Sequence, residues 1–182
     1  MNAVLHDTRG TALLAIARAA IAAAVPPAPA AWNEPWLREP GASFVTLKLD
    51  DELRGCIGTI EPHRALGDDV AFNAYAAAYR DPRFPPVDAG ERPCLQVEVS
   101  LLSPREPLAV KSEREAIAAL RPGVDGVVLT YGSLGATFLP QVWESLPRAE
   151  DFLAQLRRKA GLPPGFWHPD MQVARYTVEK FK

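Results

Sequence analysis

The chain has 182 residues, about the length of one domain, so we expect a single domain over residues 1–182. Its 48% hydrophobic and 23% charged residues are typical of a globular protein and exclude a collagen, a coiled coil or a disordered chain. A net charge of −2 disfavours non-specific nucleic-acid binding, and only two cysteines indicate a reducing compartment, so we expect a cytoplasmic protein.

Residues 1–25 predict an N-terminal helix that packs on the core. Apolar residues recur there at helical spacing: Leu13, Leu14, Ala17, Ile21 and Val25. The alternative is an export signal, but Arg18 interrupts the apolar run and Asp7 accompanies Arg9 before it. The run is also too short to span a bilayer. We therefore expect no membrane segment here.

A linker and a β-hairpin follow this helix. Residues 26–40 are rich in proline and alanine, and we expect Trp32 and Trp36 to anchor this linker on the main body, residues 41–182. Alternating residues on both sides of an Asp-Asp turn predict a hairpin over residues 44–60.

The remaining elements predict an α+β fold. We expect a helix at 66–79, a strand at 95–101, a helix opened by a Ser112–Glu115 capping box, a hairpin formed by 127–131 and 136–139, a helix at 148–160 and a strand at 173–181. Because strands come as hairpins with helices interspersed, we expect a mixed, mostly antiparallel sheet with flanking helices.

The most informative stretch runs from Leu53 to Thr59. As a strand it places Arg54, Cys56 and Gly58 on one face and Gly55, Ile57 and Thr59 on the other. A fixed positive charge beside Cys56 favours a reactive thiol, a candidate nucleophile, and the two glycines favour close approach of a ligand or of another backbone. The alternative is a free cysteine packed against a helix, with the glycines at a bulge.

A second candidate segment follows the helix at 66–79. In the stiff sequence Asp81-Pro82-Arg83-Phe84, Arg83 is a candidate to bind an anion and Asp81 a candidate acid or base. The alternative is that Asp81 and Arg83 pair with neighbouring backbone or charges. For Cys94, before the strand at 95–101, a free structural thiol is the simplest interpretation.

The histidines and the remaining motifs add little chemistry. His6, His63 and His168 lie far apart without metal-ligand spacing, and His63 is either a base for Cys56 or a solvated loop residue. The chain contains no phosphate loop, zinc motif, nucleotide fingerprint or serine elbow. We therefore expect neither a metal nor a cofactor.

Five segments together resemble the AMMECR-one domain family, whose bacterial members are called AmmeMemoRadiSam system protein A. They are Leu-Arg-Gly-Cys-Ile-Gly-Thr at 53–59, Asp-Pro-Arg-Phe at 81–84, Val-Ser-Leu-Leu-Ser-Pro at 99–104, Phe-Leu-Pro-Gln-Val at 138–142 and Lys-Ala-Gly-Leu at 159–162. The resemblance implies an intracellular α+β protein with a larger and a smaller lobe. It brings no established reaction, but implies a Memo-family protein and a radical SAM enzyme as partners.

Two functional hypotheses follow. The first is an accessory subunit or binding module that presents a surface around Arg54, Cys56 and Arg83 to these partners or to a small anionic ligand. The alternative is an enzyme that uses Cys56 as a nucleophile or redox thiol on an anionic, nucleotide- or RNA-related substrate, with Asp81 as acid or base. In both, we expect the binding residues to be Arg54, Gly55, Gly58, Thr59 and Arg83.

Overall fold

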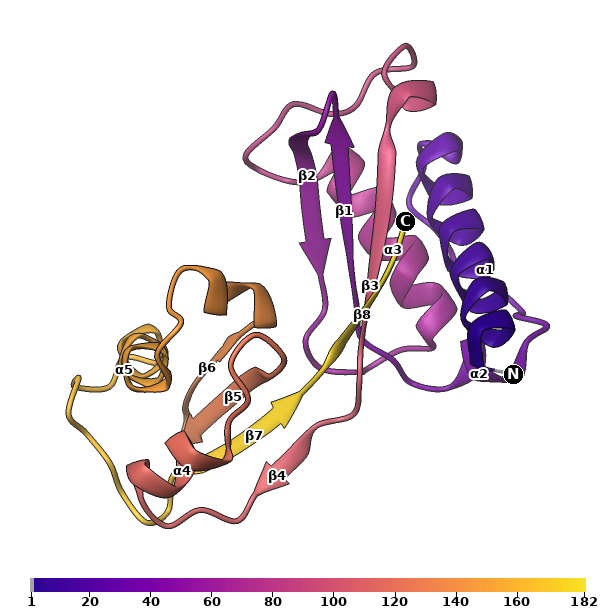
Figure 1. Cartoon of the computed structure of the whole chain (residues 1–182). Coiled ribbons are helices and arrows are strands. Elements are labelled where there is room, and N and C mark those ends of the chain that lie inside the picture. Colours follow the sequence, from indigo (N-terminus) through magenta and orange to yellow (C-terminus); the bar gives the residue numbers. More distant parts are fainter. Residues whose placement is uncertain (1) are drawn as a thin grey trace. The chain divides into compact units, whose positions relative to one another are not determined.

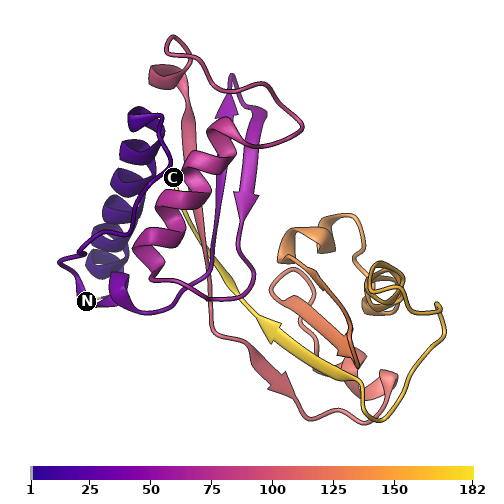
Figure 2. The same cartoon turned by 180° about the vertical axis from the view of Figure 1, so that it is seen from behind.

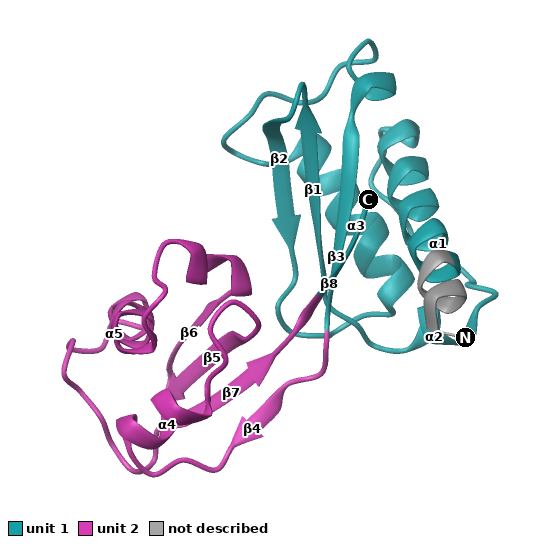
Figure 3. Ribbon diagram, in the orientation of Figure 1, with its two compact units in different colours: residues 1–102, 179–182 teal, residues 103–178 magenta. Residues whose placement is uncertain are grey.

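The computed structural model describes the backbone of residues 2–182 and the side chains of residues 8–182. The chain divides into two compact units, unit 1 of residues 1–102 and 179–182 and unit 2 of residues 103–178 (Figure 3). Each unit contains a four-stranded sheet and its own helices (Figure 1). The expected α+β class with mostly antiparallel strands is confirmed, although the strands form two sheets rather than one.

Unit 1 packs its helices on one face of its sheet. In chain order it contains α1 (Asn2–Ala23), α2 (Pro35–Arg38), β1 (Ser43–Leu49), β2 (Glu52–Gly58), α3 (Leu66–Tyr79), a 3-10 turn (Arg92–Cys94), β3 (Gln96–Leu102) and β8 (Val178–Phe181). The strands lie in the order β2-β1-β3-β8, and α1 and α3 lie side by side on the sheet (Figure 2). β2 and β3 both run antiparallel to β1.

The core of unit 1 follows from the sequence periodicity. Inward residues of β1 and β3, among them Val45 and Val99, are fully buried against Leu13 of α1 and Val70 of α3. Their opposite neighbours on the strands face away from the helices. The alternation of apolar and polar residues therefore separates a helix-covered face from a second face, which carries Cys56.

The hairpin turn and the linker anchors match the sequence analysis. Asp50 and Asp51 both adopt left-handed backbone angles, with φ of 52° and 64°, as a two-residue hairpin turn requires. Trp32 packs against the unit 1 core, and its indole N–H donates to Asp68 Oδ1 at 2.9 Å. Trp36 packs against the same core.

Unit 2 has its own sheet and core. It contains β4 (Glu106–Leu108), α4 (Glu113–Ala119), β5 (Gly126–Tyr131), β6 (Leu134–Phe138), a 3-10 turn (Pro140–Glu144), α5 (Ala149–Lys159) and β7 (Gln172–Tyr176), with strand order β4-β7-β5-β6. Trp143 stacks on Phe152 of α5 at a centroid distance of 3.8 Å. This pair lies in the buried cluster of the unit, separate from the core of unit 1.

Two local expectations need correction. The strand expected at 173–181 is two strands in two sheets, β7 and β8, because Thr177 leaves the ladder: its N–H donates to Ser103 Oγ and its C=O accepts from Ser103 N–H. In the capping box, Ser112 Oγ accepts from the Glu115 N–H as expected. The Glu115 carboxylate, however, accepts from the Lys111 N–H at 2.8 Å, one residue before the position expected.

Within the described part of the chain, each helix is too short or too polar to cross a lipid bilayer.

Candidate functional site

The two faces of β2 are distributed as the sequence predicts. Gly55 is buried, and a Cβ atom there would collide with the backbone carbonyl of Ala77 on α3. Ile57 packs against the same core. Arg54 and Cys56 therefore lie on the face away from the helices. Gly55 allows the backbone of α3 to approach the strand closely, one of the two interpretations of the glycine made from sequence.

The outer edge of β2 is covered by the loop that follows α3. The Cys56 N–H donates to Asp81 Oδ2 at 2.9 Å, and the Cys56 C=O accepts from Arg83 Nη2 at 3.1 Å. Both peptide groups thus point away from β1 and are satisfied by side chains of the loop. The pair Asp81 and Arg83 takes the place that a further strand would have at this edge.

Asp81 and Arg83 also bind each other. Arg83 Nε donates to Asp81 Oδ1 at 2.9 Å, Arg83 Nη2 donates to Oδ2 at 2.6 Å, and the Arg83 N–H reaches Oδ1 at 3.1 Å. These bonds, with the N–H of Cys56, hold the pKa of the Asp81 carboxyl well below its usual range, although its burial opposes this. Asp81 therefore remains a carboxylate at neutral pH, which favours a positioning role over a proton-donating one.

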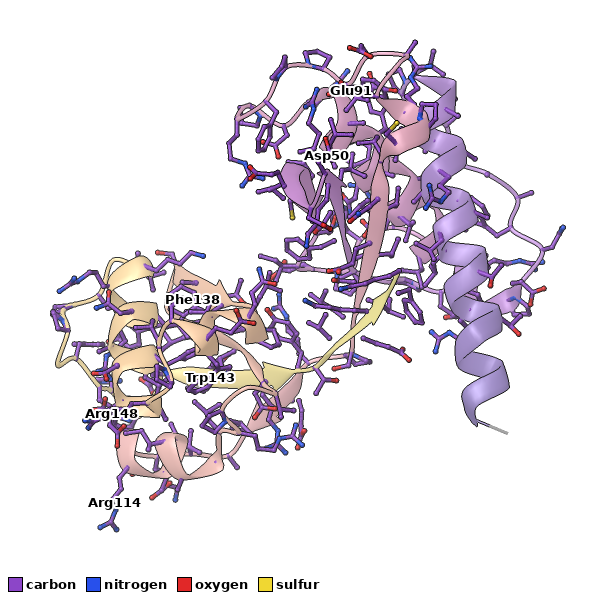
Figure 4. All side chains as sticks on the ribbon, turned by 45° about the horizontal axis from the view of Figure 1, so that its top comes forward. Asp50, Glu91, Arg114, Phe138, Trp143 and Arg148 are labelled. Atoms are coloured by element: carbon purple, nitrogen blue, oxygen red, sulfur yellow. The ribbon has the colours of Figure 1, made fainter. Side chains whose placement is uncertain are left out.

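Arg54 fastens the far part of the same loop. Its guanidinium donates from Nε and Nη2 to the two carboxylate oxygens of Glu91 at 2.8 and 2.9 Å, and from Nη1 to the Pro85 C=O at 2.9 Å. The hydrogen bond with Glu91 raises the pKa of Arg54, and the pairing lowers that of Glu91. Figure 4 shows Glu91 at the same end of unit 1 as the hairpin turn at Asp50. The Arg54 side chain is only 12% exposed, so its charge is neutralised by Glu91 rather than offered to a ligand at the surface.

The thiol of Cys56 is half-buried between two polar neighbours. The Thr46 hydroxyl of β1, opposite Cys56 in the hairpin, donates to Cys56 Sγ at 3.3 Å. The pKa of Arg83 is raised first by its hydrogen bond with Asp81 and further by the Cys56 side chain beside it. Arg83 is 52% exposed, in contrast to Arg54. The structure thus brings Cys56, Asp81 and Arg83 together, with Arg83 as the cation next to the thiol.

A buried polar cluster lies at the end of β2. Thr59, a candidate binding residue, accepts at its hydroxyl from Asn73 Nδ2 at 3.1 Å, and Asn73 also donates to the Ser43 C=O and to Asp69 Oδ2. Asp69 accepts from both the N–H and the hydroxyl of Ser43. Sequence reasoning missed this cluster, although Asn73 lies on the inward stripe of α3, where a polar residue signals a buried network.

Other residues expected at the site have different surroundings. A Cβ at Gly58 would collide with the ring of Phe44, its partner in the hairpin, so an aromatic side chain covers this glycine. His63 is exposed, with Nδ1 2.7 Å from the Glu61 C=O and Nε2 2.7 Å from Arg64 Nη2, so its ring is engaged away from Cys56. Cys94 is free and exposed in the 3-10 turn. The side chain of His6 lies outside the described residues.

The side chains described hold no cluster of three or more His, Cys, Asp or Glu residues arranged to bind a metal ion.

Sequence reasoning also missed Glu91 and Thr46. Nothing near Arg54 in sequence indicates Glu91, which lies 37 residues away. Thr46 could have been found from the hairpin register, which places it opposite Cys56.

The chain resembles proteins of archaea and bacteria. A family model described as AMMECR1 matches residues 14–181. A protein of Methanothermobacter thermautotrophicus is 43% identical over 144 residues, which cover 76% of this chain and 73% of that protein. A protein of Thermotoga maritima is 41% identical over 152 residues, 82% of each chain. The crystal structure of the uncharacterized protein PH0010 from Pyrococcus horikoshii matches with a TM-score of 0.74 and 35% identity, over 92% of this chain and 88% of that one.

Proposed function

Because the chain belongs to the AMMECR1 family, we propose that it is an accessory binding module that acts in the cytoplasm with a Memo-family protein and a radical SAM enzyme. The surface it presents is formed by β2 and the loop of residues 81–93, around Cys56 and Arg83. Two free cysteines are consistent with a reducing compartment.

One observation carries this proposal: the charged side chains of the site form ion pairs with one another. Asp81 and Glu91 neutralise Arg83 and Arg54 and tie the loop to β2. Such an arrangement supplies little acid or base chemistry, but it holds a surface in one conformation. A surface that is already ordered loses little conformational entropy when a partner binds. Arg83, half-exposed at its centre, is suited to a contact with an acidic or carbonyl-bearing group of the partner.

The test is a titration of the purified chain with the Memo-family protein and the radical SAM enzyme of the same organism, separately and together, by isothermal titration calorimetry. We expect binding of at least one, weakened at least tenfold by Arg83→Ala. Arg148→Ala, at an exposed arginine of unit 2, is the matched control. Circular dichroism checks that both variants fold. Binding that is equal in the wild type and the folded Arg83→Ala variant contradicts the proposed surface, and absence of binding to both proteins contradicts the partners.

A second candidate is an enzyme whose nucleophile or redox thiol is Cys56, acting on an anionic substrate. The hydroxyl of Thr46 on Sγ and the guanidinium of Arg83 beside it support this alternative. Iodoacetamide treatment of the native chain at pH 7, with mass-spectrometric mapping, tests it, because exposed Cys94 is an internal reference. Faster modification of Cys56 than of Cys94 favours the enzyme, and modification of Cys56 only after denaturation favours the binding module.

A further inference from the structure

A groove lies two strands from Cys56, along the part of β3 that β8 does not reach. β8 has four residues whereas β3 has seven. Lys182, which follows β8, lies beside Glu98, with 3.2 Å between Nζ and Oε2. The end of β8 is therefore opposite the middle of β3, and the edge at Leu95 and Val97 continues beyond it. Figures 1 and 2 place this edge next to α1.

Two cavities border this edge and form one groove between α1 and β3. Their volumes are about 300 and 250 Å³, and both are lined by Arg18, Leu95 and Val97. On the side of α1, the lining adds the apolar residues Ile21, Ala22 and Pro93 and the charged Arg92. Towards the other face it is polar, with Lys48, Gln96, Glu98 and Lys182. The groove thus offers an apolar floor and a polar rim along a sheet edge.

The register of the sheet shows which peptide groups point into the groove. The N–H and C=O of Cys56 point to the loop, so the facing pair of Thr46 and Cys56 exchanges no ladder hydrogen bonds. In an antiparallel ladder, the peptide groups of Thr46 must then point to its other neighbour, Glu98 of β3. Glu98 is therefore a hydrogen-bonded partner of β1.

Because peptide groups alternate in direction along a strand, those of Val97 point the other way, into the groove. The C=O of Leu95, two residues earlier, has the same direction, and it accepts from Arg18 Nη1 at 3.5 Å. That contact supports the assignment. The N–H and C=O of Val97 therefore face the groove and are placed to pair with one further strand.

Two arginines of the groove, Arg18 and Arg92, carry positive charge that no described carboxylate neutralises. Among the residues that the structure describes, neither Arg18 nor Arg92 pairs with an acidic side chain. Their guanidiniums make long contacts to backbone carbonyls, at 3.5 Å to Leu95 and 3.4 Å to Ala22, and that of Arg92 also lies over the Tyr79 ring, 5.9 Å from its centroid. The Nε of Arg92 is buried without an acceptor. Two arginines at the walls of the groove therefore favour an anionic occupant.

We propose that this groove binds an extended, acidic peptide segment of a partner protein, which adds to β3 as a strand. The backbone of the peptide pairs with Val97, its alternate apolar side chains rest on the floor near Ile21, and its carboxylates contact Arg18 and Arg92. A small inorganic anion would use the arginines but neither the floor nor the strand edge. This surface is independent of the one proposed around Cys56.

The binding test uses two fluorescein-labelled, acetylated hexapeptides of alternating valine and glutamate, one in each register, and the same peptides with lysine in place of glutamate. In fluorescence anisotropy we expect a glutamate peptide to bind, and Arg18→Glu and Arg92→Glu each to weaken binding at least tenfold. Arg114→Glu, at an exposed arginine that projects from unit 2 in Figure 4, is the matched control. Failure of both glutamate peptides to bind at about 1 mM, or equal binding of the lysine peptides, overturns the proposal.

Hydrogen exchange measured by NMR separates strand addition from ionic adsorption. We expect the bound peptide to slow exchange at the Val97 amide and to leave the Gln96 amide, which is directed to β1, unchanged. Binding without protection of Val97 overturns the proposed geometry. Analytical ultracentrifugation of the chain without peptide gives the third outcome: a doubled mass together with a protected Val97 amide assigns the groove to a second copy and overturns the acidic peptide.

Discussion

The sheet of unit 1 has two edges that are protected in different ways. At the β2 edge, Asp81 and Arg83 satisfy the peptide groups of Cys56 directly, and each is neutralised by the other. At the β3 edge beyond β8, Arg18 and Arg92 lie beside backbone carbonyls, and no acidic side chain that the structure describes neutralises their charge. A sheet edge can thus be closed by side chains that mimic a strand, or left open with charged side chains beside it. The closed β2 edge gives a fixed surface, and the open β3 edge leaves a site for another chain.

The largest effect is expected from closing the space behind β2. Gly55→Ala places a methyl group against the backbone carbonyl of Ala77, in the last turn of α3. We expect a loss of about 3 kcal/mol in the free energy of unfolding, measured with urea. Gly165→Ala is the control, because nothing lies within 4 Å of a Cβ there, and should change stability by less than about 0.5 kcal/mol. Equal stability of both variants would contradict the tight packing of β2 on α3.

A smaller loss is expected from weakening the β2 clamp. Asp81→Asn removes the negative charge that accepts from Arg83 and Cys56, and we expect the protein to lose about 2 kcal/mol of stability. The Cys56 amide should exchange faster in NMR measurements, since its acceptor is weakened. Asp51→Asn, in the exposed hairpin turn, serves as control. An unchanged Cys56 exchange rate would show that the loop does not protect this edge.

Acid should open the β2 edge gradually. The pKa values of Glu91 and Asp81 are lowered on folding from 4.5 and 3.8, so their stabilisation is complete above these values and is lost as the pH falls through the folded values. Stability should therefore be flat from pH 7 to 5 and then decrease, first through Glu91 and then through Asp81, by at most about 1.4 kcal/mol per pH unit for each group. Urea unfolding at several pH values checks this. In Asp81→Asn the decrease below pH 3.8 should be shallower, and an identical slope would argue against the clamp.

The smallest effect is expected at the open edge. Arg18 is exposed and makes one long contact, to Leu95, so Arg18→Ala should change the free energy of unfolding by less than about 0.5 kcal/mol. Thermal unfolding of this variant beside Asp81→Asn measures the difference between the two edges directly. A loss above about 1 kcal/mol would mean that Arg18 is a structural clamp like Arg83 rather than a free group.

Local patterns in the sequence predicted much of unit 1. The hairpin around Asp50, the helix at 66–79 and the faces of β2 follow from periodicity and turn chemistry, which depend on neighbours in the chain. Local patterns do not predict that Glu91 binds Arg54 or that Asp81 binds the Cys56 N–H. These residues are 37 and 25 positions apart in the chain and meet only after the loop has folded back on β2.

The sequence pattern also did not predict that residues 173–181 divide into two strands. β7 and β8 form one continuous extended stretch by pattern, and only the contacts of Thr177 with Ser103 reveal where one sheet ends and the other begins. Periodicity reports that a segment is extended and which face is apolar, but not which sheet it joins.

The late position of β8 has a consequence for synthesis on the ribosome. Unit 1 begins at the N-terminus, but its fourth strand follows the whole of unit 2, so residues 103–178 are translated between β3 and β8. While the ribosome adds these 76 residues, β8 does not yet exist, and the side of β3 that β8 later covers has no partner strand. At about 5–20 residues per second this lasts several seconds. During this interval Arg18 and Arg92 place positive charge beside β3, and charge beside an unpaired strand disfavours its pairing with another chain.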